Sequence, residues 1–183
     1  AVGFRSGRYV GIALTPSGKG YWLATSDGNI LGFGDAHFYG STAGFSLGSD
    51  VVDIAATRTG HGYYLVTSSG GVLAFGDARY HGSAAKLSLH APIVSVVPTQ
   101  TGRGYFLLAA DGGVFTYGDA TFHGSAGALH LGAPLVDMAT TTSGNGYTLV
   151  GADGGVFTYG DASFFGSAAT LPLRAPIVSI SLR

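Results

Sequence analysis

Four aspartates recur at one fixed spacing, and they are the first residues of this sequence that could do chemistry. Each lies in a Gly-Asp-Ala triplet, and each triplet begins 42 residues after the previous one. A ring of such carboxylates could bind a cation or the hydroxyl groups of a sugar. We favour a turn role, in which each side chain accepts backbone N–H hydrogen bonds between two strands. The four residues are Asp35, Asp77, Asp119 and Asp161.

Positions that differ between otherwise similar repeats are the best candidates for ligand binding, because packing does not dictate them. One such position carries Trp22, Tyr64 and Phe106 in the first three repeats. Aromatic rings with a polar edge can stack on sugars, and packing between repeats is the alternative interpretation. The predicted ligand-binding residues are Trp22, Tyr64, Phe106, His37, Arg79, Tyr39, His81 and His123.

Other chemistry finds little support in the sequence. His81 and His123 occupy equivalent positions and could form a metal site, but partly exposed strand residues are the favoured interpretation. The sequence has no Cys, and all ten of its acidic residues are Asp. A nucleophilic cysteine and a Glu-containing acid pair are therefore excluded. We predict no metal, no cofactor and no enzymatic activity.

The period of 42 residues indicates a solenoid, a propeller or another repeat array. In the second repeat, residues 51–56, 63–67, 72–75 and 79–83 have the composition of short strands separated by glycine-rich turns. Three repeats carry Asp-Gly between the second and third of these segments, which is a strong β-hairpin signal. Glycine is so frequent that no segment predicts a helix.

The second segment of each repeat is apolar on both faces, as in residues 105–108, and this favours sheets stacked against one another. We predict an all-β fold, a β-propeller of four 42-residue blades with three to four antiparallel strands each. A β-solenoid ranks second. The chain would form one repeat domain over residues 1–183, with repeats at about 8–49, 50–91, 92–133 and 134–175 and a closing strand at 176–183.

The first strand of the repeat occurs five times, whereas the other segments occur four times. The additional copy is Val178-Ser179-Ile180, four periods after Val10-Gly11-Ile12. It could close a four-bladed ring within one chain, which we favour slightly, or it could pair with another copy of the chain through its exposed edge.

The string from Gly20 to Ser41 resembles a tandem repeat of secreted actinobacterial proteins, and Asp153 to Ala162 matches the same pattern. The resemblance covers about residues 8–183 and implies a module that accompanies cell-wall or carbohydrate-active hydrolases. The hairpin portion is also similar to propellers of the regulator-of-chromosome-condensation type and of the tachylectin type. These similarities bear on the fold more than on the ligand.

Composition limits the partners. The net charge is −1 and only 10% of residues are charged, which does not favour nucleic acid. No apolar run is long enough for membrane insertion. We predict an extracellular or cell-surface, non-catalytic module with repeated weak sites for glycan or cell-wall polymer. The alternatives are a structural or protein-interaction scaffold that could self-assemble and is accessory to a hydrolase, and, in third place, an enzyme using unrepeated acids such as Asp50 and Asp53.

Overall fold

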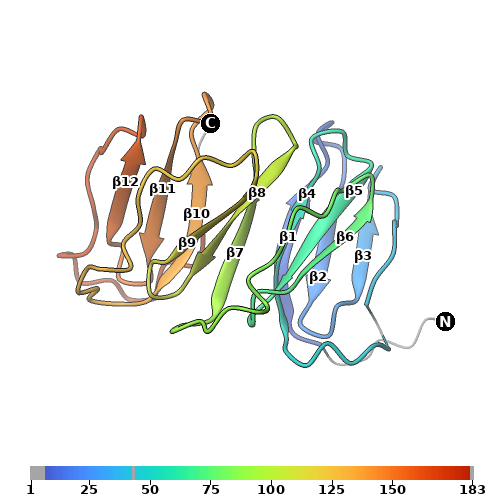
Figure 1. The fold of residues 1–183 in the computed structure, drawn as a ribbon, viewed down its shortest axis with the longest axis horizontal. Coiled ribbons are helices and arrows are strands. Elements are labelled where there is room, and N and C mark those ends of the chain that lie inside the picture. Colours follow the sequence, from blue (N-terminus) through green and yellow to red (C-terminus); the bar gives the residue numbers. More distant parts are fainter. Residues whose placement is uncertain (1–6, 43, 182–183) are drawn as a thin grey trace.

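The computed structural model describes residues 7–42 and 44–181, and within these it contains strands and no helix. Four antiparallel three-stranded sheets, or blades, follow one another in chain order (Figure 1). This confirms the predicted all-β repeat fold. Blade 1 is β1 (Tyr9–Leu14), β2 (Tyr21–Thr25) and β3 (Ile30–Phe33); blade 2 is β4 (Val51–Ala56), β5 (Gly62–Thr67) and β6 (Val72–Gly76); blade 3 is β7 (Ile93–Pro98), β8 (Gly104–Ala109) and β9 (Val114–Gly118); blade 4 is β10 (Leu135–Thr140), β11 (Gly146–Gly151) and β12 (Val156–Gly160).

The hairpins form where the sequence predicts them. Gly112 follows Asp111 in the turn between β8 and β9 and has a φ of +91°, a conformation that glycine adopts without steric cost. The middle strands β5, β8 and β11 are buried along their whole length. Each middle strand pairs with a neighbour on both sides within its own blade.

The predicted fourth strand of each blade, residues 79–83 in the second repeat, is wrong: this segment has no strand partner. It is a linker that leads from one blade to the next. Hydrogen bonds from tyrosine side chains hold the linker in place, where a strand would be held by backbone pairing. The Tyr64 hydroxyl lies 3.2 Å from both the N–H and the carbonyl oxygen of Arg79, and the Tyr105 hydroxyl donates to the carbonyl of Gly82 at 2.5 Å.

The predicted closed four-bladed ring is also wrong for this chain. The first strands β1, β4, β7 and β10 contact one another in series, but no strand of blade 1 contacts a strand of blade 4. The coloured ribbon accordingly runs from blade 1 at one end to blade 4 at the other (Figure 1). The three junctions turn the sheets too little to bring the last blade back to the first. The array is therefore open.

The predicted closing strand lies beside blade 4 but forms no strand pairing over residues 176–181. The N–H of Ile177 donates to the carbonyl of Ala152 at 3.0 Å, and the N–H of Ile180 donates to the Asp137 carboxylate at 3.0 Å. The segment thus occupies the place of the first strand of a following blade. The last two residues of the prediction, 182 and 183, lie outside the described residues.

The hydrophobic core is divided among the three junctions between blades. Each junction has its own cluster of buried side chains, centred on Trp22 and Tyr63, on Tyr64 and Tyr105, and on Phe106 and Tyr147. In the described part of the chain, no helix of a length and hydrophobicity suited to crossing a membrane is found.

In each of the three linkers that join two blades, one glycine approaches an aromatic ring so closely that a side chain would not fit. A Cβ at Gly124, where φ is +132°, would lie 2.5 Å from Cδ1 of Tyr159. Gly166 is the equivalent residue of blade 4 and has a φ of +123°, but a Cβ there would meet nothing within 4 Å. A side chain would therefore strain the backbone at both positions, but it would clash with an aromatic ring only at Gly124.

We expect Gly124→Ala to lower the free energy of unfolding by about 1–3 kcal/mol more than Gly166→Ala does, because only the former overpacks a junction. Urea denaturation of the two variants at low protein concentration measures the difference. Equal losses would mean that strain alone, and not the ring of Tyr159, requires glycine in the linker.

Candidate functional site

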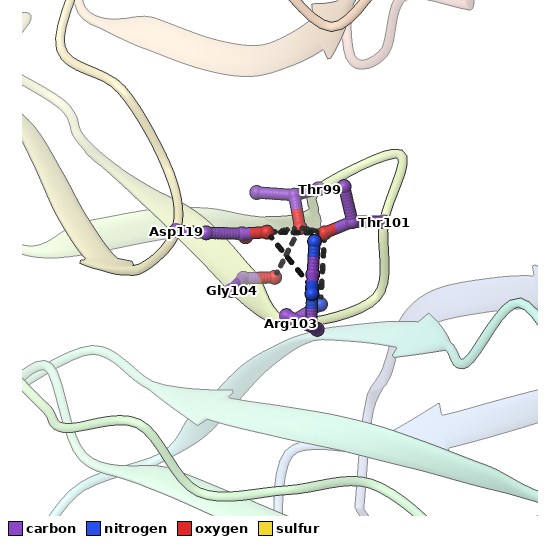
Figure 2. Close-up of polar contacts among 5 residues, drawn as sticks. All are labelled: Thr99, Thr101, Arg103, Gly104 and Asp119. Atoms are coloured by element: carbon purple, nitrogen blue, oxygen red, sulfur yellow. Dashed lines mark hydrogen bonds and ion pairs between the residues drawn. The ribbon is translucent and has the colours of Figure 1, made fainter.

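The repeated aspartates are bonded to hydroxyl groups of the turn between the first and second strands of the same blade. Figure 2 shows the arrangement in blade 3, where the Asp119 carboxylate faces two threonines. The hydroxyls of Thr99 and Thr101 donate to its two oxygens at 2.9 and 2.5 Å. Arg103 lies alongside, with Nε 3.5 Å from the carboxylate, but its side chain is largely exposed and the ion pair adds little.

The same hydroxyl clasp occurs in every blade, so these aspartates hold two turns of their own blade together. The donors differ from the prediction, because they are side-chain hydroxyls of an adjacent turn and not backbone N–H groups. These hydrogen bonds hold the pKa of Asp35, Asp119 and Asp161 below its ordinary value. The other three clasps are Thr15 and Ser17 with Asp35, Thr57 and Thr59 with Asp77, and Thr141 and Ser143 with Asp161.

A second set of carboxylates links the first strands of neighbouring blades. A β-bulge shifts the register of β4 between Val51 and Asp53, and such bulges re-aim side chains. The Asp53 carboxylate accepts from the N–H of Val96 in blade 3 at 3.0 Å and from the N–H of Ile54 at 2.8 Å. Asp137, its equivalent two blades later, accepts from the hydroxyl of Ser95 at 2.9 Å.

Asp53 has the most perturbed acidity among these groups. Although the residue as a whole is half-buried, burial of the carboxyl group raises its pKa to about 7. The N–H donors of Val96 and Ile54 lower this pKa, and the nearby Asp137 carboxylate raises it. The first strand of blade 2 thus carries one carboxyl group, that of Asp53, whose protonation changes close to neutral pH.

The predicted aromatic ligands are buried in the junctions between blades. Trp22, Tyr64 and Phe106 are at most 2% exposed, so they offer no face to a ligand and match the alternative interpretation of packing. Each packs on the tyrosine of the next blade, with ring centroids 5.7, 5.1 and 5.4 Å apart respectively. Blade 4 has Thr148 at the equivalent position.

The other predicted ligands divide into two groups. His37 and Arg79 are exposed on the linkers, where a ligand could reach them. Tyr39, His81 and His123 are half-buried beside the junction tyrosines. The Tyr39 hydroxyl donates to the carbonyl of Gly60 at 3.2 Å. Binding through any of these five residues stays a prediction.

The two histidines have one unusual feature. Nε2 of His81 and Nε2 of His123 are buried, and neither has a hydrogen-bond partner within residues 7–42 and 44–181. Over the same ranges, no group of three or more His, Cys, Asp or Glu side chains is placed to hold a metal ion. We identify no metal-binding geometry around them.

Sequence reasoning missed a row of exposed aromatic side chains on the linkers. Their exposed fractions lie between 55% and 62%, so all four blades present this ring in the same way. Each ring directly follows one of the variable exposed positions, such as His37 or Arg79. The recurrence of an aromatic residue every 42 positions was the available signal, and the predicted fourth strand obscured it. We call this set the aromatic row: Phe38, Tyr80, Phe122 and Phe164.

A pocket also recurs in blades 3 and 4, beside the turn between the second and third strands of each blade. In blade 3 it measures about 400 Å³ and is lined by Asp111, Leu129 and His130 among others. In blade 4 the equivalent pocket measures about 380 Å³ and is lined by Asp153, Leu171 and Arg174 among others. We call these the turn pockets. Each combines a carboxylate with an exposed leucine.

Comparison with solved structures identifies the architecture. A crystal structure of the Cps50 (Swd1) β-propeller domain of Myceliophteria thermophila superposes with a TM-score of 0.61 over 94% of this chain, at 12% sequence identity. The chain has a β-propeller fold built of repeated blades. It spans 57% of the length of that domain, which agrees with an open array.

Sequence comparisons do not assign the chain to a family. No protein-family model matches the chain, and no curated protein matches it.

The pKa of Asp53 predicts a pH-dependent stability. Its value rises from an ordinary 3.8 to about 7 on folding, so the folded protein holds this proton more tightly than the unfolded chain between those values. The contribution of Asp53 to stability therefore falls as the pH rises from about 4 to 7. We expect Asp53→Asn to be more stable than the wild type at pH 8 by between about 1 and 4 kcal/mol, and nearly equal to it at pH 4.

Thermal unfolding of both proteins across this pH range measures the effect as the difference between the two curves. Asp119→Asn is the matched control, because its carboxylate titrates below this window and its loss should shift the curve without changing its slope. Parallel curves for Asp53→Asn and the wild type would contradict the assignment.

Proposed function

We propose that the protein is a non-catalytic, extracellular or cell-surface binding module that presents several similar weak sites to a glycan or cell-wall polymer. The observation that supports this most directly is the aromatic row, with one exposed ring at the same place in each blade. Repetition of a site suits a repetitive ligand, because several weak contacts on one polymer combine into a higher overall affinity.

The residues around each ring suit sugars. A Phe or Tyr face stacks on the apolar face of a pyranose, and a polar neighbour can bond its hydroxyl groups. The residue before the ring is exposed in all four blades and supplies that neighbour: His37, Arg79, Thr121 and Ser163. These side chains differ, so the four sites would share a ligand class and differ in preference.

The carboxylates support binding without catalysis. The four repeated aspartates accept hydroxyl hydrogen bonds within their own blades, and Asp53 and Asp137 accept bonds between blades. A glycosidase needs two carboxyl groups free to face one glycosidic bond. Acids engaged in this way are poorly suited to such a pair.

A protein-interaction scaffold is the second candidate, and a separate observation favours it. Each repeat exposes a further large apolar side chain at one equivalent position, and in blades 3 and 4 this side chain lines the turn pocket. A row of exposed apolar side chains suits a protein partner better than a sugar. These four side chains are Phe45, Leu87, Leu129 and Leu171.

We expect Phe122→Ala to weaken binding to a cell-wall polymer by about tenfold, and replacement of all four rings of the aromatic row to abolish it. A short oligosaccharide that reaches one site should bind the wild type and Phe122→Ala with similarly low affinity. An array of glycans and cell-wall polymers identifies the ligand, and titration calorimetry of the variants on that ligand measures the losses.

Ser69→Ala is the control, because Ser69 is exposed in a turn and belongs to no aromatic site. It should bind like the wild type. The absence of binding to every glycan would overturn the proposal and leave the scaffold as the function to pursue.

A further inference from the structure

Each junction between blades contains a tyrosine inserted into a socket of the preceding blade. Tyr105 of blade 3 enters blade 2, where its hydroxyl donates to the carbonyl of Gly82 at 2.5 Å and accepts from the N–H of His81 at 3.1 Å. Its ring packs on Tyr64 at 5.1 Å. Tyr63 and Tyr147 make the same hydroxyl contacts with the linkers of blades 1 and 3. Three junctions therefore share one construction.

Blade 4 has the socket without the tyrosine. Phe165 and Gly166 are the equivalents of His81 and Gly82, and together with Thr148 they line a cavity of about 480 Å³. Phe165 is 96% exposed. Gly166 keeps the positive φ of the other linker glycines, although no ring lies against it within the described residues.

Blade 1 has the tyrosine without the socket. Tyr21 is the equivalent of Tyr105, and its hydroxyl has no hydrogen-bond partner in the part of the chain that the structure describes. Its ring stacks on Phe33 with an interplanar angle of 22°, whereas the equivalent pairs inside the array are tilted by 40° to 43°. The pair has a different geometry where no socket orients it.

The first strand of blade 1, which pairs with the strand of Tyr21, also exposes large apolar side chains. Ile12 is 60% exposed, whereas its equivalents Ile54, Val96 and Met138 are at most 4% exposed beneath the preceding blade. Tyr9 and Leu14 are exposed on the same strand. One end of the array thus carries the half of a junction that the other end lacks.

We propose that a second copy of this chain docks head to tail on the first, with its Tyr21 in the socket formed by Thr148, Phe165 and Gly166. The argument is continuity with the three internal junctions, each of which pairs these same two surfaces. The contact is heterologous, so it closes a ring where the rotation permits and otherwise continues as a filament. It is independent of the glycan proposal, because it uses other residues.

The segment at 176–181 competes for part of this junction. It occupies the place that β1 of the second copy would take, and the N–H of Ile180 bonds the Asp137 carboxylate where the N–H of Ile12 would bond it. Because β1 pairs along its length with β2, whereas residues 176–181 pair with no strand, we expect the incoming β1 to displace the segment.

Two single variants and their mixture test the docking. Tyr21→Ala removes the inserted ring, and Gly166→Ala places a Cβ where Phe33 of the second copy would lie. Light scattering and sedimentation over a concentration series should show the wild type associating, and each variant alone doing so at least about 30-fold more weakly. Circular dichroism confirms that each variant is folded.

The mixture distinguishes this geometry from any symmetric one. Tyr21→Ala keeps an intact socket and Gly166→Ala keeps an intact Tyr21, so an equimolar mixture should form a complex of two chains and no larger species. Tyr21→Phe is the matched control for the ring and should associate better than Tyr21→Ala. A wild type that stays monomeric at its highest soluble concentration, or a mixture that fails to associate, would overturn the proposal.

The displacement has its own test. Ile177→Pro removes the N–H that bonds the carbonyl of Ala152 and so loosens the competing segment. With Tyr21 and the socket of blade 4 unchanged, this variant should associate with itself about tenfold more strongly than the wild type. Weaker association of this variant would mean that residues 176–181 belong to the junction, and would overturn the exchange with β1.

Discussion

A tyrosine hydroxyl buried between neighbouring blades is the interaction on which the rest of the molecule depends. Tyr63, Tyr105 and Tyr147 each accept from a linker N–H and donate to a linker carbonyl of the preceding blade. The linker has no strand partner, so these bonds satisfy backbone groups that burial would otherwise leave unpaired. The same ring fixes the spacing between sheets and holds the segment that presents the aromatic row.

The buried and exposed aromatic residues therefore have separate tasks. Trp22 is buried in a junction, and its indole N–H donates to the carbonyl of His37 at 2.7 Å, directly beside the exposed Phe38. Tyr64 contacts the backbone of Arg79 in the same way, directly beside Tyr80. The buried rings thus position the rings that face solvent. A ligand site on the linkers would be rigid, because the linker backbone is bonded to side chains of the core.

The sequence determined the period, the hairpins and the all-β class, because glycine turns and strand composition act over a few residues. It did not determine ring closure, since that depends on the angle between blades, which arises from contacts between repeats. Variation at Trp22, Tyr64 and Phe106 predicts positions that packing does not dictate. In the structure all three rings are buried, and each packs on an equivalent tyrosine of the next blade, so the junction accepts different rings at this position. The aromatic row lies in segments with the composition of a strand, so the sequence does not mark its rings as exposed.

The open series of blades gives the molecule the thermodynamics of a one-dimensional chain of neighbours. Blades 2 and 3 are each stabilised from both sides, whereas blades 1 and 4 are stabilised from one side only. Unfolding should then advance inward from the ends, with amide hydrogen exchange fastest in β3 and β12 and slowest in β5 and β8. Covering an end would convert a terminal blade into an internal one, so assembly and local rigidity would rise together.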